Sequence, residues 1–489
     1  MSTLSRLPSR CRPTAAALGL LVTLAGCAVG PDYKKPTPQV PATYSETGPW
    51  KIAVPKDGLP KDNWWSVFGD PALDAFEQQA ATASPTLQAA VARRDQARAL
   101  AGISPGDYFP QISVDANGSR TRYSGNRQVP PGAANTAYTI DSFLLPLDLS
   151  YEVDLWGRVR RANESARALA DAAAAAYQTV LLGVQADVAQ VYFQIRSLSV
   201  ERAIVSHSVE TRRAALDLVQ TRFSGGASGE LDVLRAEAEL AAAESDVLTI
   251  DQRQAQLRHA LAVLCGQLPE GFRFDSNQSP GVTTPAIPVG LPSDLLERRP
   301  DVAAAERTLA AFNAQIGVAK AAFFPSIHLV GSAGYNSTEL NSLFNWPSNQ
   351  WSVGPLISLP IFQGGRNRAN LHRAEAAYEE AVANYRIRVL VAFQEVEDNL
   401  SGLQYLDEQA LVIARAVIAS RKAAELSALR YKSGLVSYLE VVDADRTALQ
   451  NERLATQLDA LRLSSRILLI KALGGGWTKS EPGELTKGR

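Results

Sequence analysis

The chain has 489 residues, 46% of them hydrophobic, and a formal net charge of −1 at pH 7. This content is ample for a large folded body, and the near-neutral charge excludes the strongly basic field of a nucleic-acid-binding protein. Its cysteines (Cys11, Cys27 and Cys265) are too few for a disulfide framework. The four histidines are isolated and neither a phosphate loop nor a nucleophile elbow occurs, so we expect no metal centre and no enzymatic activity.

The N-terminus has the pattern of a secretory signal. Three arginines precede an apolar run over 14–24, which leads through Ala25-Gly26 to Cys27. Small residues before a cysteine resemble the bacterial lipobox, in which the cysteine is diacylated and becomes the new N-terminus. A buried cysteine beyond an ordinary cleavage site is the alternative. We expect a lipoprotein signal peptide over 1–26 and an extended, lipid-anchored tail over 27–62, since two or three acyl chains anchor stably.

The next stretch predicts two short helices and two strands. One helix follows Asn63-Trp64-Trp65, and another begins at Ser84-Pro85, because proline is tolerated in the first helical turn. Apolar and polar residues then alternate over about 111–123 and 139–155, which predicts strands with one apolar and one largely acidic face. The acidic residues singled out on the polar face are Asp148, Glu152 and Asp154.

The stretch 157–266 predicts a helical hairpin of unusual length. Residues 157–223 contain no proline, and their apolar residues recur at alternating spacings of four and three. About 66 helical residues at ~1.5 Å each span roughly 100 Å. This length indicates coiled-coil-like packing of helices side by side. From these helices alone, a plain coiled-coil protein is an equal alternative.

The same hairpin recurs over 365–474, at a constant offset of 208 residues (365 − 157 and 474 − 266). Upstream of the strands the offset is 215 (300 − 85, for Pro300 and Pro85), so the strand loop of the second copy is about seven residues shorter. A period of this size indicates a duplicated domain half rather than a solenoid. We expect a first repeat over 63–267, a linker over 268–292, a second repeat over 293–476 with strands about 326–336 and 350–362, and a C-terminal tail over 477–489.

The predicted order in each half is therefore helix, strand, strand, long helix and return helix. Two strands in each half give four strands in the chain. A membrane barrel needs every strand edge paired, and the smallest single-chain barrels use eight strands. Two copies would supply eight strands and a filled interior, whereas three copies would supply twelve and leave room for a pore. A soluble sheet with one solvated face is the alternative.

Several motifs together resemble the outer-membrane efflux factors, in the OprM/NodT-like lipoprotein branch of the TolC-type superfamily. They are Val29-Gly30-Pro31-Asp32-Tyr33, Asn63-Trp64-Trp65, the run Gly290–Asp301, and Leu473-Gly474-Gly475-Gly476-Trp477. The resemblance covers essentially the whole mature chain. It implies a mainly α fold with a small β part: a trimer whose twelve-stranded outer-membrane β-barrel is continued by a periplasmic α-helical barrel.

The resemblance also implies a function. The implied function is a passive, gated exit duct for drugs or other small molecules. Its implied partners are a periplasmic adaptor (membrane fusion) protein and an inner-membrane RND-type pump. No cofactor is expected beyond the diacylglycerol and N-acyl chain on Cys27. The residue after Cys27 is Ala28 rather than Asp, which in the lipoprotein sorting rule implies release to the outer membrane of a Gram-negative bacterium. The alternative is a periplasmic coiled-coil structural or adaptor lipoprotein, although an adaptor would carry a single helical hairpin.

Two sites are expected on the hairpins. In the family the hairpin turns meet the adaptor, which assigns that contact to Gly226, Ala227, Ser228, Gly434, Leu435 and Val436. On the helix that follows, Leu439, Asp443 and Arg446 stand at i, i+4 and i+7 and form one stripe. This run aligns with the family's gate segment, so the three residues are candidates for a periplasmic gate. A surface charge pair on an amphipathic helix is the alternative.

A third site is expected on the strands. Asp148, Glu152 and Asp154 are predicted to face the lumen, because a charged side chain on the lipid face costs a few kcal/mol. We expect them to make the lumen cation-preferring.

Overall fold

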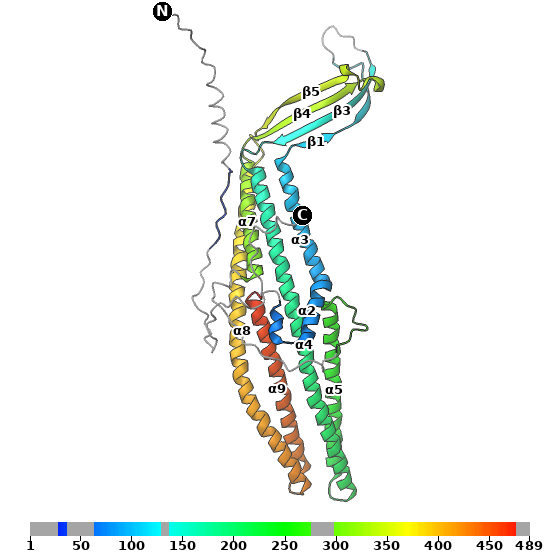
Figure 1. Ribbon diagram of the computed structural model, residues 1–489, viewed down its shortest axis with the longest axis vertical. Coiled ribbons are helices and arrows are strands. Elements are labelled where there is room, and N and C mark those ends of the chain that lie inside the picture. Colours follow the sequence, from blue (N-terminus) through cyan, green and yellow to red (C-terminus); the bar gives the residue numbers. More distant parts are fainter. Residues whose placement is uncertain (1–27, 37–62, 129–135, 275–297, 476–489) are drawn as a thin grey trace, which may run out of the picture. The chain divides into compact units, whose positions relative to one another are not determined.

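The computed structural model of the chain describes residues 28–36, 63–128, 136–274 and 298–475. The expectations for the signal peptide, Cys27, most of the tail, most of the linker and the C-terminal tail lie outside these ranges. The helices are η1 (Trp64–Phe68), α2 (Pro71–Ala83), α3 (Pro85–Ile103), η2 (Ser104–Tyr108), α4 (Arg158–Ser224), α5 (Glu230–Leu264), α7 (Pro300–Ala321), η3 (Leu340–Ser342), η4 (Trp346–Ser348), α8 (Arg366–Lys432) and α9 (Tyr438–Ala472). The strands are β1 (Gln111–Val114), β2 (Asn117–Tyr123), β3 (Tyr138–Glu152), β4 (Ser326–Ser337) and β5 (Asn349–Ser358) (Figure 1).

The chain forms two compact units, and neither of them is one repeat. Unit 1 comprises Met1–Pro36, Asp95–Ala172 and Ala305–Tyr385, and unit 2 comprises the remaining segments Thr37–Arg94, Ala173–Ala304 and Arg386–Arg489. Each unit draws on both repeats, because the long helices α4 and α8 contribute to both units and strand β3 pairs with strand β4. The repeats are therefore units of sequence rather than units of packing.

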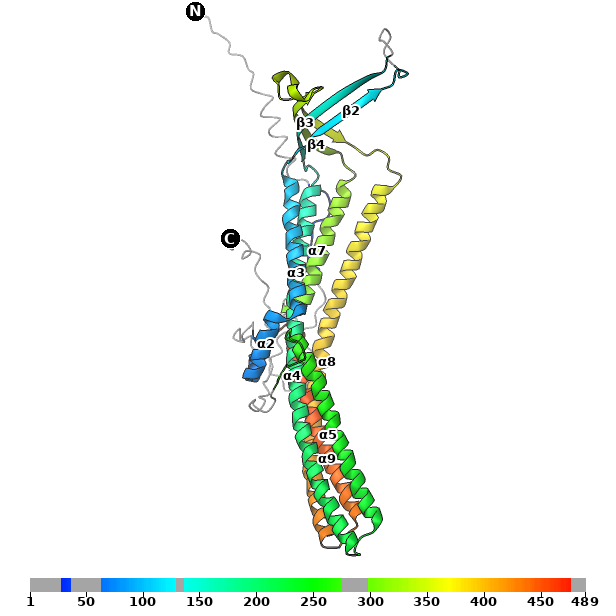
Figure 2. The same ribbon diagram turned by 90° about the vertical axis from the view of Figure 1, so that its right-hand side faces the viewer.

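Unit 1 contains an antiparallel sheet in the order β1-β3-β4-β5, with β2 pairing to β3 beyond the end of β1 (Figures 1 and 2). The strand expected over 111–123 is interrupted at Asp115–Ala116, so the four predicted strands appear as five segments, with β1 and β2 sharing one strand position at the edge of β3. The interruption lies opposite Pro146 of β3, which has no N–H to donate to the ladder. The register on the two sides is the same, since Val114 pairs with Leu147 and Asn117 with Leu144.

Two other strands end earlier than expected. Strand β3 ends at Glu152 rather than near residue 155, and β5 ends at Ser358 rather than near residue 362. Pro360 follows β5 closely and cannot donate to a ladder, so the pairing stops before it.

The duplication is preserved in the strand register. Adding 215 to a residue of β1 or β2, and 208 to its partner on β3, yields an observed pair between β4 and β5. The pair Gln111 and Ser150 thus corresponds to the pair Ser326 and Ser358. In the same way, the β2 pair of Gly118 and Phe143 corresponds to Ala333 and Trp351. The two offsets read from the sequence therefore describe equivalent positions in three dimensions.

The sheet has one polar and one apolar face. The polar face carries Gln111, Ser113, Asp148, Ser150, Ser332 and Ser352, and the apolar face carries Ile112, Val114, Leu147, Leu149, Leu329, Val353 and Ile357. The apolar side chains remain uncovered by the described chain, as the exposures of Ile112 (63%) and Val353 (67%) show. An apolar sheet face of this extent marks a contact with lipid or with another chain.

In unit 2, the parts of α4 and α8 that belong to it lie beside α5 and α9 (Figures 1 and 2). Their core includes Phe68 of η1, Leu73 of α2 and Tyr192 of α4, all buried. Asp70 caps α2 by accepting from the Ala72 N–H at 3.1 Å. Its other carboxylate oxygen accepts from the Tyr192 hydroxyl and from Arg196, both at 2.7 Å. The short helices are thereby attached to the long helix α4 by both apolar and charged contacts.

Candidate functional site

No cluster of three or more His, Cys, Asp or Glu side chains that could hold a metal ion occurs among the described residues. Cys265 is buried, and burial followed by the charge of Glu77 raises the pKa of its thiol to about 11. It is therefore an unreactive thiol at neutral pH. None of the helices that the structure describes is both long and apolar enough to cross a membrane.

The two hairpin turns have the same backbone geometry. Gly226 ends α4 with a φ of 73°, and Gly434 ends α8 with a φ of 74°. The N–H of the next residue donates back to the helix in each case, from Ala227 to the Arg222 carbonyl at 2.7 Å and from Leu435 to the Arg430 carbonyl at 2.9 Å. This is a Schellman-type cap, in which glycine adopts the left-handed conformation without strain.

The predicted tip residues differ in exposure. Gly226, Ala227, Gly434 and Leu435 are exposed. Val436 instead packs against the cluster of buried residues just behind the turns, which is formed by Val219, Ala236, Tyr431, Tyr438 and Val442. Ser228 is partly buried and donates to Asp232 at 2.9 Å. The freely accessible part of the tip is therefore narrower than the six residues expected.

The predicted gate stripe lies on the exposed side of α9. Leu439 is 51% exposed, and Asp443 and Arg446 are exposed as well. The intervening Tyr438 and Val442 face inward and are buried. The three candidates thus share one uncovered face, as their spacing predicts.

Arg446 is not a free cation on that face. Its guanidinium forms an ion pair with Glu239 of α5, which belongs to the other hairpin. The carboxylate of Glu239 also contacts Arg212 of α4 at 3.2 Å, and Arg212 in turn binds Asp445 of α9 at 3.0 Å. We call Arg212, Glu239, Asp445 and Arg446 the hairpin network, because it connects the helices of the two repeats within one chain.

The surroundings of this network are poorly hydrated. Burial, and then the charges of Glu239 and Asp445, raise the pKa of Tyr438 to about 12. The side chains of Arg212 and Glu239 are each only 9% exposed, whereas that of Arg446 is 64% exposed. The network therefore has a buried half, formed by Arg212 and Glu239, and an accessible half at Arg446.

Sequence reasoning missed Arg212 and Glu239, although a signal for them existed. At an offset of 208 their counterparts in the second repeat are Ser420 and Thr447. A charged residue that replaces a small hydroxyl residue at an equivalent position of a duplicated helix indicates a role specific to one repeat.

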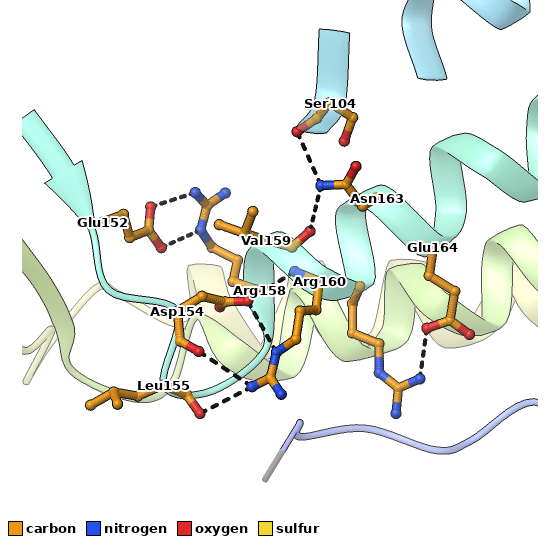
Figure 3. A network of polar contacts seen from close by, with 10 residues as sticks. Ser104, Glu152, Asp154, Leu155, Arg158, Val159, Arg160, Asn163 and Glu164 are labelled. Carbon is orange, nitrogen blue, oxygen red and sulfur yellow. Dashed lines mark hydrogen bonds and ion pairs between the residues drawn. The ribbon is translucent and has the colours of Figure 1, made fainter. Parts of the chain in front are cut away.

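The acidic residues predicted to line a lumen divide into two groups. Asp148 lies within β3 on the polar face, opposite Ser113 and Ser332. Glu152 is the last residue of β3, and Arg158 donates to it at 2.7 Å. Asp154 lies beyond the strand, where it accepts from the backbone N–H of Arg160 at 2.9 Å (Figure 3).

Glu152 and Asp154 therefore have a structural role at the start of α4. Each carboxylate is neutralised by an arginine of the first helical turn, and Asp154 satisfies an N–H that has no partner within the helix (Figure 3). These contacts reduce the negative charge that Glu152 and Asp154 can contribute beside Asp148, and the lumen-facing position of all three residues stays a prediction. Of the three, only Asp148 has no ion pair in the described part of the chain.

The motif Val29–Tyr33 lies along the helices of unit 1. Val29 donates its N–H to the Trp156 carbonyl at 2.9 Å, and Asp32 forms an ion pair with Arg161 at 2.6 Å. Tyr33 donates to Glu306 of α7 at 3.1 Å. The segment that would follow a lipidated cysteine is thus held next to the junction between β3 and α4.

The motif around Arg299 has a comparable role in unit 2. Its guanidinium binds Asp301 at 2.8 Å and Glu395 of α8 at 2.6 Å, and donates to the Ala472 carbonyl at the end of α9 at 3.0 Å. Arg299 therefore joins α7, α8 and α9 through charged and backbone contacts.

A family model described as outer membrane efflux protein matches residues 77–267 and 291–475. The chain belongs to this family. The cation efflux system protein CusC of Escherichia coli O6:H1 is 32% identical over 96% of this chain and 99% of its own. The outer membrane protein OprJ of Pseudomonas aeruginosa is 32% identical over 94% of this chain and 95% of its own.

Solved structures agree with this assignment. The outer-membrane channel OprN is 33% identical, with a TM-score of 0.85 over 92% of this chain and 100% of its own. The open state of the MtrE outer membrane channel of Neisseria gonorrhoeae is 31% identical, with a TM-score of 0.81 over 92% of this chain and 98% of its own. The protein is an outer-membrane efflux channel of a Gram-negative bacterium and projects into the periplasm.

Proposed function

We propose that three copies of this efflux channel form one continuous duct, with the strands closing a twelve-stranded barrel in the outer membrane and the helices forming a barrel in the periplasm. The observation that carries the proposal is the two-faced sheet, whose apolar face is uncovered and whose outer strands each have one neighbour. A hydrocarbon environment tolerates a sheet only when its edges are paired, and a single copy is too small to close.

The aromatic residues support a membrane location for the sheet. Trp346 of η4 is 81% exposed, and Trp351, near the start of β5 and thus far along the strand from its connection to α8, is 73% exposed. Exposed aromatic side chains at one end of an apolar strand surface are typical of the interface between lipid and water.

The duct is gated at its periplasmic end by the second hairpin of each copy, through Leu439, Asp443 and Arg446. The hairpin network supports this assignment, because Arg446 holds α9 to α5 of the first hairpin. An ion pair with one accessible partner is weak, on the order of 1 kcal/mol or less. A contact of that size can be broken by the binding of an adaptor at the neighbouring tips.

The partners of the duct are a periplasmic adaptor and an inner-membrane RND-type pump, and the adaptor binds at Gly226, Ala227, Gly434 and Leu435. The cargo is a small molecule, and the names of the relatives do not point to one chemical class. At similar identity they include proteins named for the efflux of cations and of toluene and for the export of pyoverdine. Cys27 carries the lipid anchor, and the docked segment after it supports a position near the membrane.

Two measurements on the detergent-extracted full chain test the proposed function. Native mass should give three chains per particle, and planar bilayers should show channels with one conductance. A monomer, or a trimer that conducts no ions in any state, would refute the duct. Deletion of the gene should sensitise cells to small toxic compounds, and the wild-type copy should restore resistance.

A further inference from the structure

Two arginines lie on the apolar face of the sheet, which the proposed barrel turns toward lipid. Strands β1 and β2 pair with β3 in one register, so alternate residues from Ile112 onward share a face. Arg120 and Arg122 belong to this series, and both are exposed. Their partners across the ladder, Asp141 and Thr139, lie on the same face. The apolar face therefore ends in a charged patch, which we call the arginine patch and define as Arg120, Arg122 and Asp141.

The arginine patch lies at the outer limit of the apolar band. Ile112 is near the helical end of the sheet, because β1 follows η2 closely. Arg120 and Arg122 come eight and ten residues later (120 − 112 and 122 − 112). At ~3.4 Å per residue these separations are about 27 and 34 Å along the strand. A strand tilted by about 40° rises about 21 and 26 Å over these lengths, which bracket the ~25 Å height of an outer-membrane apolar band.

Aromatic side chains separate the apolar residues from the arginine patch. On β3 this face runs from Leu147 to Phe143 and then to Asp141. Trp351 of β5 is exposed on the same face, in the row of Leu147. Aromatic residues mark the boundary between hydrocarbon and headgroups in membrane barrels. The order apolar, aromatic and basic therefore follows a path from the hydrocarbon to the headgroups of the outer leaflet.

The two arginines differ in their local partners. The Nε atom of Arg120 lies 3.4 Å from Asp141, yet the Arg120 side chain remains 76% exposed. Arg122 has no ion pair in the part of the chain that the structure describes, and the segment 124–137 contains no acidic residue. The arginine patch thus combines two cations with one anion, and its excess positive charge is accessible.

The arginine patch occurs in the first repeat only. At the offset of 215 that relates β2 to β4, the counterparts of the two arginines are Tyr335 and Ser337. Neither counterpart is charged, although both strands pair in the equivalent register. The strand itself therefore does not require the arginines, and a barrel of three copies carries three such patches.

We infer that Arg120 and Arg122 bind the phosphate groups of a lipid in the outer leaflet. A charged side chain on the lipid face is tolerated when it reaches the headgroups, and a guanidinium binds phosphate with two parallel hydrogen bonds. At alternate positions the two arginines are about 7 Å apart, so that one phosphorylated headgroup can contact both. The inference rests on the proposed barrel and adds the lipid that the barrel holds.

Lipid binding to the detergent-extracted full chain tests the inference. The particle would be titrated with diphosphoryl lipid A, and the bound lipid would be counted by native mass spectrometry. Wild type should bind up to three lipids per particle. Arg120→Gln with Arg122→Gln should weaken binding by about tenfold or more, because hydrogen bonds to charged groups are lost. Dephosphorylated lipid A and inorganic phosphate should bind wild type no better than they bind the variant.

Two further variants separate the arginine patch from a general effect on folding. Asp141→Asn removes a competing carboxylate and should tighten the binding of lipid A, which a loss of folding cannot do. The matched control is Arg127→Gln. Arg127 lies over the rings of Tyr123 and Tyr138, which belong to the opposite face at the same end of the sheet. This control should bind lipid A as the wild type does.

The outcomes distinguish the lipid from the duct. Equal binding of lipid A by wild type and the double glutamine variant, in particles of three chains, would overturn the inference but leave the duct intact. Equally tight binding of dephosphorylated lipid A would show attachment to the apolar face alone and would also overturn it. A double variant whose particles dissociate more readily but bind lipid normally would assign the arginines to a contact between copies instead. A single-chain native mass would overturn both proposals.

Discussion

Arg446 of α9 forms an ion pair with Glu239 of α5, so the gate candidate of the second repeat is bound to the first repeat of the same chain. Glu239 is buried and also contacts Arg212, whereas Arg446 is accessible. The position of α9 relative to α5 therefore depends on a charge pair that a partner protein can reach from one side. Breaking this pair would leave the helices of both hairpins intact, which is what the proposed gate requires.

The first prediction concerns this pair. Arg446→Ala with Asp443→Ala should raise the single-channel conductance in planar bilayers, because the stripe and its bond to Glu239 are both lost. Arg446→Lys alone keeps a cation beside Glu239 and should stay closer to the wild-type conductance. The control is Arg235→Ala, since Arg235 occupies the position of Asp443 in the first repeat. Unchanged conductance in the double alanine variant, with three chains per particle, would place the constriction elsewhere.

The second prediction concerns the tips. A photoreactive cross-linker at Ala227 or Leu435 should capture a periplasmic adaptor in cells, because both residues are exposed at the ends of the hairpins. The same cross-linker at Val436 should capture less, since that side chain packs against the buried cluster behind the turn. Capture of the adaptor only from the loops at the other end of the strands would contradict the assignment.

The third prediction separates Asp148 from the two other acidic residues. Asp148→Asn should reduce the cation preference of the channel, measured as a reversal potential under a salt gradient, because three unpaired carboxylates leave the lumen. Replacing Glu152 and Arg158 together by glutamine removes a neutral ion pair and should leave the reversal potential unchanged. An equal effect of both changes would show that the local ion pair does not cancel the charge of Glu152.

The fourth prediction concerns the anchor. The intact mass of protein extracted from membranes should correspond to a chain that begins at Cys27 and carries a diacylglycerol and one further acyl chain. Cys27→Ser should weaken membrane attachment of the unassembled chain, while the assembled barrel still inserts. A mature protein with an unmodified Cys27, or one that retains Met1, would rule out the lipid anchor.

The fifth prediction concerns a buried carboxyl group in α2. Both side-chain oxygens of Glu77 are buried without a hydrogen-bond partner, and burial, followed by the charge of Asp74, raises its pKa from 4.5 to about 9. The folded protein therefore holds a proton that the unfolded chain releases above pH 4.5. Stability should fall as the pH rises from about 5 to about 9, by at most on the order of 3 kcal/mol at pH 7.

Glu77→Gln should raise the unfolding temperature at pH 8 and flatten its dependence on pH. The exposed Glu379→Gln is the matched control, because it removes the same charge from a solvated position. Thermal unfolding followed by circular dichroism at pH 5, 7 and 8 measures the effect. A pH dependence that Glu77→Gln leaves as steep as in the wild type would show that Glu77 is hydrated.

The sequence by itself determined the long helices, the tip turns and the duplication. Helices α4 and α8 follow from an uninterrupted apolar spacing, and Gly226 and Gly434 mark their ends. These features are local, because periodicity and backbone conformation depend on neighbouring residues. The offsets of 208 and 215 residues between the repeats can be read directly from the sequence, and the strand register reproduces them.

Only the tertiary structure decided which of these elements meet. The pairing of β3 with β4, the interruption of a strand opposite Pro146, and the bond between Arg446 and Glu239 all join residues remote in sequence. No periodic pattern encodes such partners, since a charged residue on a helix has the same place in the sequence pattern whether it faces water or another segment of the chain. The ion pairs of Glu152 and Asp154 show the same limit. The sequence shows that both residues are acidic and how they are spaced. Their arginine partners, Arg158 and Arg160, are identified only by the geometry of the junction between β3 and α4.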